Sequence, residues 1–291
     1  MSNLSFANCL RLLRDSPLPL AQRWGLLTAY AHLARNEGPG SVSLLGKRLK
    51  FPDARFAGTL FREIFVHHTY YFPGMPPTGR IVDCGSNVGF SVLYFSALYP
   101  QHRIIGFEPN PDAFEFLRRN CEDNGLHQVE LHHAAVGPTD GELKFYKGNN
   151  GVASPLGSSL ETRAGGCAPV RVKQRMLAPF LDEPVALLKV DIEGAEGALF
   201  DQLFRDDSLD QVERMIVEFH HNLPGVLHDL SWFLNALCAS GFCYQLAAHY
   251  DLSLRTRRGP RFQDVTVYAS RDHSSTSPQT RSVESCQLSL S

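Results

Sequence analysis

The sequence predicts an α/β fold built on a doubly wound, mostly parallel sheet of about seven strands with helices on both faces. From Arg80 onward, short apolar segments typical of buried strands alternate with longer segments of helical periodicity. Parallel strands need crossover connections of this length, which usually contain a helix. A glycine-rich turn follows the first apolar segment, as in many folds of this class. The 291 residues are enough for one such domain.

Local composition places each element of this sheet. Short runs of apolar and β-branched residues predict the strands. These lie near residues 80–84, 103–108, 129–134, 185–191, 213–219, 241–248 and 262–269. Apolar residues at helical spacing predict the helices. These lie near residues 88–98, 111–124, 195–204 and 228–239.

Residues 1–60 are expected to form an N-terminal helical extension. Leucines recur at helical spacing before about residue 36, and Pro17 and Pro19 divide that segment into two short amphipathic helices. The rest of the segment predicts a turn at 38–43, a hairpin at 44–51 and a helix at 59–66.

The main domain is expected to span residues 61–270 and to contain an insertion at residues 137–180. The insertion holds predicted strands at 142–147 and 169–175 around a Gly/Ser-rich loop at 148–166. Because long loops over strand ends are often functional, we expect the insertion to cover the site. The tail at residues 271–291 is rich in Ser, Thr and Gln, so we expect it to be disordered.

The turn after the first predicted strand is the strongest functional motif. Asp83 ends that strand, and Gly85, Asn87 and Gly89 follow at alternate positions. Glycines there let the backbone turn tightly and approach a ligand at the start of a helix. Glu108 ends the next predicted strand, where its carboxylate can accept hydrogen bonds from both hydroxyls of a ribose. The motif therefore predicts a nucleotide cofactor.

The spacing of this motif distinguishes two kinds of nucleotide. NAD needs the pattern Gly-x-Gly-x-x-Gly, which lets its pyrophosphate touch the backbone, and the turn departs from that pattern. Asp83 would repel a pyrophosphate, whereas it could orient the ammonium group of S-adenosylmethionine. S-adenosylmethionine also has a ribose diol and no phosphate. We therefore expect S-adenosylmethionine, with an NAD-dependent oxidoreductase as an alternative.

Three motifs in order carry a resemblance to a known family. They are Asp83-Cys-Gly-Ser-Asn-Val-Gly, Gly106-Phe-Glu-Pro-Asn-Pro and Val185-Ala-Leu-Leu-Lys-Val-Asp-Ile-Glu-Gly-Ala-Glu-Gly. Over about residues 60–270 the chain resembles the FkbM family of S-adenosylmethionine-dependent methyltransferases. The resemblance implies a class I, Rossmann-like methyltransferase fold whose last two strands form an antiparallel edge. It also implies a cofactor site formed by Asp83, Gly85, Ser86, Asn87, Gly89, Glu108, Pro109, Asn110 and Ala135.

Methyl transfer to a hydroxyl requires that its proton be removed, so a base or a metal ion is expected. The catalytic candidates are Asp191, Glu193, Lys189, His220 and His221, and of these His220 has the ordinary pKa best suited to neutral pH. Lys189 shares one side of its strand with Asp191, so a salt bridge is an alternative role. Asp191, Glu218 and His220 could instead bind Mg²⁺, or the two acids could only hydrogen-bond to loop amides.

The resemblance implies methylation of an oxygen, most naturally a hydroxyl of a sugar, a glycolipid or a natural-product small molecule. The residues alone do not exclude an N-methyltransferase, a methyltransferase that acts on a macromolecule, or a noncatalytic module that binds S-adenosylmethionine. A homodimer is also compatible with the sequence.

Composition limits the partners and the compartment. A formal net charge of −2 predicts no general attraction to nucleic acid, and the arginine-rich segment from Arg255 to Arg261 is read as a solvated loop. No stretch approaches the roughly 20 apolar residues that span a bilayer. The seven cysteines are scattered without a zinc-binding spacing, which predicts a reducing, cytoplasmic environment.

Overall fold

The computed structural model describes residues 5–147, 158–159, 168–223, 226, 228–247 and 264–271. Three regions named above lie wholly or mostly outside the described residues: the Gly/Ser-rich loop, the arginine-rich segment and the tail. The tail was predicted to begin at Arg271, but that residue ends the last strand.

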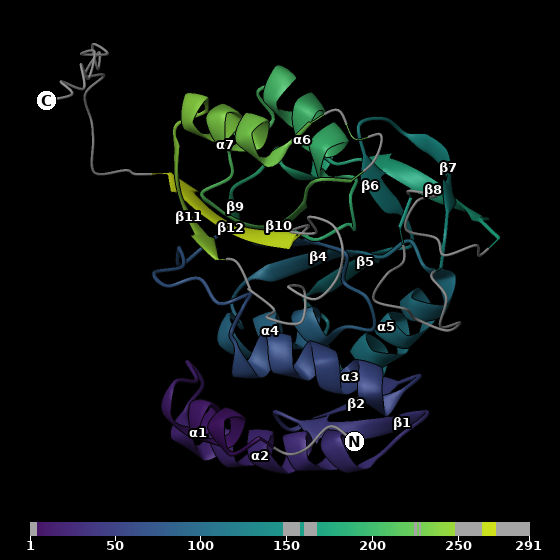
Figure 1. The fold of residues 1–291 in the computed structure, drawn as a ribbon, viewed down its shortest axis with the longest axis vertical. Helices are drawn as coiled ribbons and strands as arrows, with labels where there is room; N and C mark the ends of the chain where they lie inside the picture. Colours follow the sequence, from purple (N-terminus) through teal and green to yellow (C-terminus); the bar gives the residue numbers. More distant parts are fainter. Residues whose placement is uncertain are drawn as a thin grey trace, which may run out of the picture.

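A seven-stranded sheet forms the centre of the fold (Figure 1). Its strands in spatial order are β11 (Phe242–Ala247), β12 (Asp264–Arg271), β10 (Arg214–His220), β9 (Val185–Val190), β3 (Arg80–Cys84), β4 (Arg103–Phe107) and β5 (Val129–His132). The strands from β10 to β5 are parallel, whereas β12 is antiparallel to both β10 and β11. This order confirms the predicted doubly wound, Rossmann-like sheet with an antiparallel edge. The chain reverses direction across the sheet between β3 and β9, which is where such sheets bind ligands.

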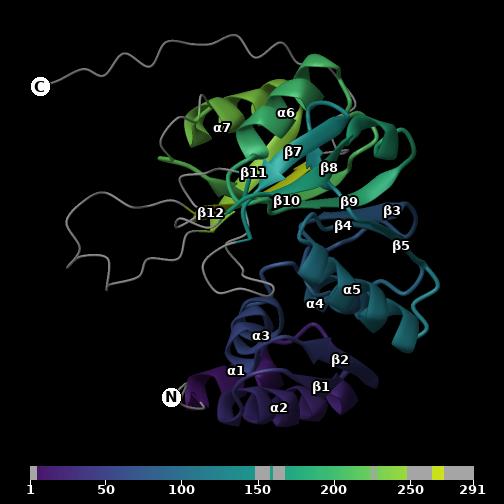
Figure 2. The ribbon, with the colours of Figure 1, turned by 90° about the vertical axis from the view of Figure 1, so that its right-hand side faces the viewer.

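Helices cover both faces of this sheet (Figures 1 and 2). They are α4 (Phe90–Leu98) and α5 (Pro111–Asp123) on one face, and α6 (Glu196–Arg205) and α7 (Leu230–Ala239) on the other. Because side chains alternate along a strand, Ile81 belongs to the core on the α4 face and Val82 to the core on the α6 face. Within the described residues, no helix combines the length and apolar character needed to cross a membrane.

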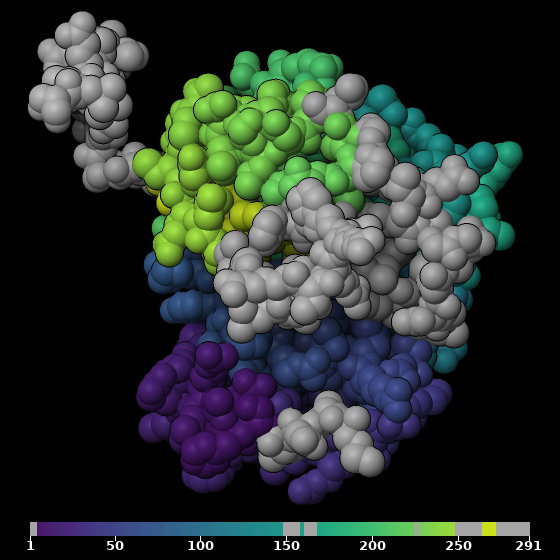
Figure 3. All heavy atoms as spheres, in the orientation of Figure 1, coloured from purple at the N-terminus to yellow at the C-terminus, as the bar shows by residue number. Residues whose placement is uncertain are grey.

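The N-terminal segment forms an additional layer beneath α4 and α5 (Figures 1 and 2). In the space-filling view its purple and blue atoms form the lower end of the molecule (Figure 3). Its elements are α1 (Phe6–Arg14), α2 (Leu20–Arg35), β1 (Gly40–Leu44), β2 (Lys47–Phe51), α3 (Ala54–Phe61) and the short π-helix η1 (Arg62–Val66). The side-chain amide of Asn120 on α5 binds the backbone of Lys50 in β2, so the layer is fixed to the main domain. The apolar side chains of the layer also join the core on the α4 face.

Two local predictions for this layer were wrong. Most of the predicted turn at 38–43 is strand β1, and the turn lies at Leu45 and Gly46, whose φ angles are 53° and 73°. Positive φ at both central residues is typical of a two-residue hairpin loop, but leucine rarely occupies such a position. The helix predicted from Thr59 begins at Ala54, because Asp53 caps it by accepting a hydrogen bond from Phe56 N at 3.0 Å.

A second, three-stranded sheet combines two strands of the insertion with a short strand that ends at Gly137, where the insertion begins. Its strands in spatial order are β6 (Ala135–Gly137), β8 (Val170–Met176) and β7 (Gly141–Phe145). In the chain, β8 is followed by the 3₁₀ helix η3 (Ala178–Phe180). Both predicted strands of the insertion are present. Strand β6 was not predicted, because three residues are too few to show an alternating pattern.

Candidate functional site

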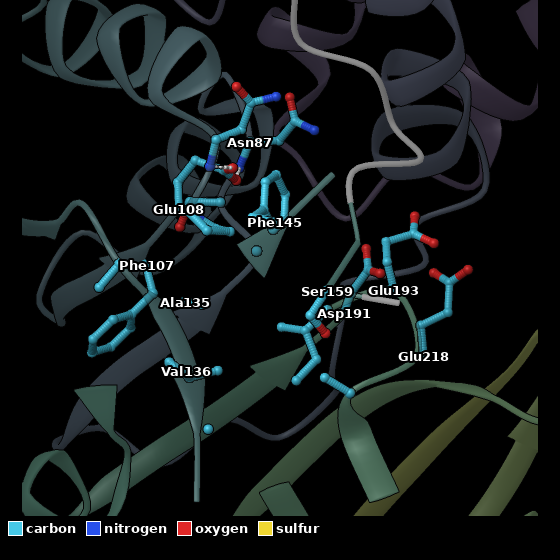
Figure 4. Close-up of a pocket in the computed structure, with 18 of the residues that line it drawn as sticks. Asn87, Phe107, Glu108, Ala135, Val136, Phe145, Ser159, Asp191, Glu193 and Glu218 are labelled. Atoms are coloured by element: carbon cyan, nitrogen blue, oxygen red, sulfur yellow. Dashed lines mark hydrogen bonds between the residues drawn. The ribbon is translucent and has the colours of Figure 1, made fainter. Parts of the chain in front are cut away.

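A pocket of about 880 Å³ lies at the carboxyl ends of β3, β4, β9 and β10. Figure 4 shows Glu108 and Asn87 together at one end of the pocket, and Asp191, Glu193 and Glu218 at the other. Most of the predicted site residues line it: Gly85, Ser86, Asn87, Glu108, Pro109, Asn110, Ala135, Asp191, Glu193, Glu218 and His220. Asp83, Gly89 and Lys189 do not line it.

Glu108 holds the loop that follows β3. Its Oε2 accepts a hydrogen bond from Asn87 N and its Oε1 accepts one from Asn110 N, each at 2.8 Å (Figure 4). Burial raises the pKa of Glu108 to about 7, although these two N–H groups favour the carboxylate. Each oxygen keeps a second lone pair, so the carboxylate can still accept hydrogen bonds from a ligand.

The turn needs glycine at position 85 because two strand ends meet there. A Cβ atom on Gly85 would lie 2.0 Å from the carbonyl oxygen of Asp191, and the φ angle of Gly85 is +88°. The N–H groups of Gly85 and Ser86 both donate to the carbonyl of Phe107, at 3.0 and 2.9 Å. Gly89 has a structural role instead, since with φ +98° it caps the start of α4 and packs against Leu117.

Asp83 and Lys189 pair with each other in the interior. The side chains are 0% and 1% exposed, and Lys189 Nζ lies 3.3 Å from Asp83 Oδ1. Ser91 Oγ donates to the other carboxylate oxygen of Asp83 at 2.6 Å. The prediction that Asp83 directly orients a cofactor ammonium is therefore corrected, because Asp83 lies behind the loop. Lys189 is equally buried and does not line the pocket. Its Nζ also lies 3.8 Å from Asp191 Oδ2, so the salt bridge expected as its alternative role is present.

The opposite end of the pocket is rich in carboxylates. Tyr70 Oη lies 3.1 Å from Asp191 Oδ2 and 3.4 Å from Glu63 Oε1, and its proton can serve one of them at a time. Burial and the nearby Asp191 raise the pKa of Glu63 to about 7. Burial, with Asp191 and Glu63 close by, raises the pKa of Glu218 well above its ordinary value. Negative charge is thus costly here, and a cation would relieve it.

His220 is held as a cation. Its Nδ1 lies 3.0 Å from Glu196 Oε1 and its Nε2 lies 3.3 Å from Glu193 Oε2. Burial by itself lowers the pKa of His220, but Glu196 and Glu193 outweigh that effect and raise it to about 10. The expectation that His220 titrates near neutral pH is therefore wrong. An imidazolium already carries a proton on each nitrogen, so His220 cannot remove the proton of the hydroxyl that is to be methylated.

Glu63 and Tyr70 are site residues that the sequence analysis did not assign. Glu63 lies on η1 and Tyr70 lies on the segment between η1 and β3, so both precede the nucleotide-binding motif. One signal was present in the sequence, because Glu63 is an acid directly before the apolar run from Ile64 to Val66. A charge beside such a run is costly to bury unless it serves a site.

The residues that could hold a metal ion differ from the predicted set. Oxygen or nitrogen atoms of Asp191, Glu193 and His220 lie within 4.8 Å of one another, so Glu193 takes the place expected for Glu218. A metal ion needs the neutral imidazole, whereas His220 is stabilised as a cation by Glu193 and Glu196. The donor set therefore fits a metal ion poorly.

Residues 83–242 match the family model described as the methyltransferase FkbM domain. Methyltransferase 1 of Beauveria bassiana (strain ARSEF 2860) is 31% identical over 179 residues, which cover 55% of this chain and 72% of that protein. Methyltransferase sdnD of Sordaria araneosa is 30% identical over 168 residues, 47% of this chain and 65% of that protein. The crystal structure of methyltransferase FkbM from Methylobacillus flagellatus KT aligns with a TM-score of 0.43 at 14% identity, over 74% of this chain and 54% of that one. The chain therefore belongs to the FkbM family of methyltransferases.

Proposed function

We propose that this methyltransferase uses S-adenosylmethionine to methylate a hydroxyl group of a small molecule, such as a sugar, a glycolipid or a natural-product intermediate. The observation that carries the proposal is the pocket itself. It joins the Glu108 carboxylate at one end to the Asp191, Glu193 and Glu218 carboxylates at the other. When bound, S-adenosylmethionine supplies a methyl group on a sulfonium, the electrophile of an in-line displacement.

The residues at the Glu108 end fit an adenosine. The free lone pairs of Glu108 can accept the two hydroxyl protons of a ribose. Asn110 is buried, and its Nδ2 has no hydrogen-bond partner within the described residues although Asn110 lines the pocket. A buried donor without a partner is costly, so it favours a ligand that brings an acceptor, as adenine does.

Charge at the opposite end favours S-adenosylmethionine over NAD. A pyrophosphate would have to approach several carboxylates that already raise one another's pKa. A sulfonium and an ammonium group would instead be attracted to them. This argument supports the cationic cofactor without reference to the glycine spacing.

Asp191 is our candidate for the base. Lys189 has no access to the pocket and His220 is cationic, which leaves the carboxylates. Tyr70 donates to Asp191 Oδ2, so the hydroxyl can hold the carboxylate in one orientation while Oδ1 receives the proton of the acceptor. His220 pairs with Glu193 and would fix that carboxylate beside the reacting atoms.

Two experiments test this proposal in sequence. Calorimetric titrations with S-adenosylmethionine, S-adenosylhomocysteine and NAD should show binding of the first two alone, and binding of NAD alone would refute it. A panel of hydroxylated acceptors, their deoxy analogues and matched amines should then be incubated with methyl-labelled S-adenosylmethionine. We expect label on an oxygen and none on the deoxy analogue. Label on nitrogen would replace the hydroxyl assignment, and cofactor binding with no transfer would favour a noncatalytic module.

A metal-assisted version of this function is not favoured, because the cluster of Asp191, Glu193 and His220 fits a metal ion poorly. Dialysis against EDTA should leave activity unchanged if Asp191 alone acts as the base. Loss of activity that Mg²⁺ restores would establish the metal-assisted version.

A further inference from the structure

We propose that Lys189 is a positioning residue for the amino-acid end of the cofactor site: it holds the backbone of Cys84 and Gly85 in the orientation that receives the aminocarboxypropyl chain. This inference rests on the proposed use of S-adenosylmethionine. It replaces direct roles for both Lys189 in catalysis and Asp83 in binding the cofactor ammonium.

The ammonium group of Lys189 is surrounded by backbone carbonyls and carboxylates. Its Nζ donates to Gly85 O at 2.8 Å and to Cys84 O at 3.2 Å. Asp83 Oδ1 at 3.3 Å and Asp191 Oδ2 at 3.8 Å complete its surroundings as ion-pair partners. The side chain of Lys189 is 1% exposed and does not line the pocket, so Lys189 contacts the pocket-lining residues from behind.

The backbone held by Lys189 is part of the pocket wall. Gly85 lines the pocket, and it touches the Asp191 carbonyl so closely that no side chain fits between them. Asp191 N donates to Cys84 O at 3.1 Å, which joins the ends of β3 and β9 at the same point. Glu108, Gly85 and Asp191 line the same pocket, so a ligand with its ribose at Glu108 can reach this junction with its aminocarboxypropyl chain.

Charge makes lysine necessary at this position. Asp83 is fully buried, and the Tyr70 ring closes one side of Lys189 with its centroid 5.0 Å from Nζ. Burial disfavours the ammonium, but Asp83 and Asp191 outweigh it and keep the pKa of Lys189 above its ordinary value. Lys189 thus stays charged, and it neutralises the buried acid while it binds the two carbonyls.

The test compares two ligands that differ in the aminocarboxypropyl chain. S-adenosylhomocysteine carries the chain, and 5′-methylthioadenosine lacks it. Lys189→Met leaves the buried charge of Asp83 without a cationic partner and can unfold the protein. The decisive variant is therefore Asp83→Asn/Lys189→Met, which removes both charges. We expect the affinity of this variant for S-adenosylhomocysteine to fall roughly 10- to 100-fold. A loss of this size is typical when hydrogen bonds to a charged ligand group are lost. The affinity of the variant for 5′-methylthioadenosine should change by less than about threefold.

The same exchange at an exposed pair provides the control. Lys50 and Asp123 form a surface ion pair 2.7 Å apart, and Asp123→Asn/Lys50→Met should leave both affinities unchanged. The positioning role would be overturned if the folded Asp83→Asn/Lys189→Met variant lost affinity equally for both ligands, or lost affinity for neither. If the unmodified protein binds neither ligand, the proposed cofactor is wrong and this inference falls with it.

Discussion

Lys189 Nζ lies 3.3 Å from Asp83 Oδ1, so two residues with separate expected roles form a buried ion pair behind the pocket. Asp83 is the next-to-last residue of β3, and Lys189 is the next-to-last residue of the neighbouring parallel strand β9. Removal of one partner would leave a buried charge, whereas removal of both is much less costly. The pair therefore belongs to the framework of the site, and the residues that can touch a ligand are those in front of it.

Glu108→Ala should weaken binding of S-adenosylhomocysteine. If Glu108 accepts the ribose hydroxyls, the loss should be roughly 1.5–3 kcal/mol, the usual contribution of hydrogen bonds to a charged group. Calorimetry measures this change, with Glu122→Ala on the exposed face of α5 as the control. Unchanged affinity in the Glu108 variant would remove Glu108 from the ribose site.

Affinity for S-adenosylhomocysteine should rise with pH through about 7. Burial raises the pKa of Glu108 to about 7, and a ribose diol needs the carboxylate as acceptor. Below that pH a proton must leave before the ligand binds, so affinity should fall by up to about tenfold per pH unit. Calorimetric titrations with S-adenosylhomocysteine at pH values from about 5.5 to about 8.5 measure this profile, because that range extends about 1.5 units to either side of the pKa. The same dependence in Glu108→Ala would assign it to another group, such as Glu63.

Tyr70→Phe should lower turnover while cofactor binding persists. The substitution keeps the buried ring and removes the hydroxyl, whose single proton can be donated to Asp191 Oδ2 or to Glu63 Oε1. Loss of orientation at the base should reduce kcat roughly 10-fold or more, within the range of general base catalysis. Tyr71→Phe is the matched control, because Tyr71 is more than one-third exposed and does not line the pocket. Similar rates for both variants would exclude a role for the Tyr70 hydroxyl.

Two glycine substitutions should change stability in opposite directions. Gly85→Ala places a Cβ atom 2.0 Å from the Asp191 carbonyl at a φ of +88°, and we expect a loss of roughly 2–4 kcal/mol. Gly25→Ala lies within helix α2 with open space around its Cβ, and we expect a gain of roughly 0.5–1 kcal/mol. Urea denaturation measures both, and a Gly85→Ala protein of normal stability would contradict the close approach of β3 and β9.

The sequence predicted those features of the fold and the site that depend on residues close together in the chain. The strand before Asp83, the glycine turn and the following helix are contiguous, so composition alone predicted them. Glu108 was found in the same way, because a carboxylate at the end of the next strand has a fixed position relative to that turn. The three-residue strand β6 and the hairpin turn at Leu45 carried too little local signal to be predicted.

By itself, therefore, the sequence determined the order of strands and helices, the family and the residues at the Glu108 end of the pocket. The tertiary structure decided the chemistry of the opposite end. It brings Tyr70 to Asp191 across 121 residues of chain, encloses Lys189 behind the loop, and surrounds His220 with the carboxylates that raise its pKa to about 10. Hydrogen bonds, burial and pKa values arise from partners distant in sequence, and only the folded chain specifies which partners meet.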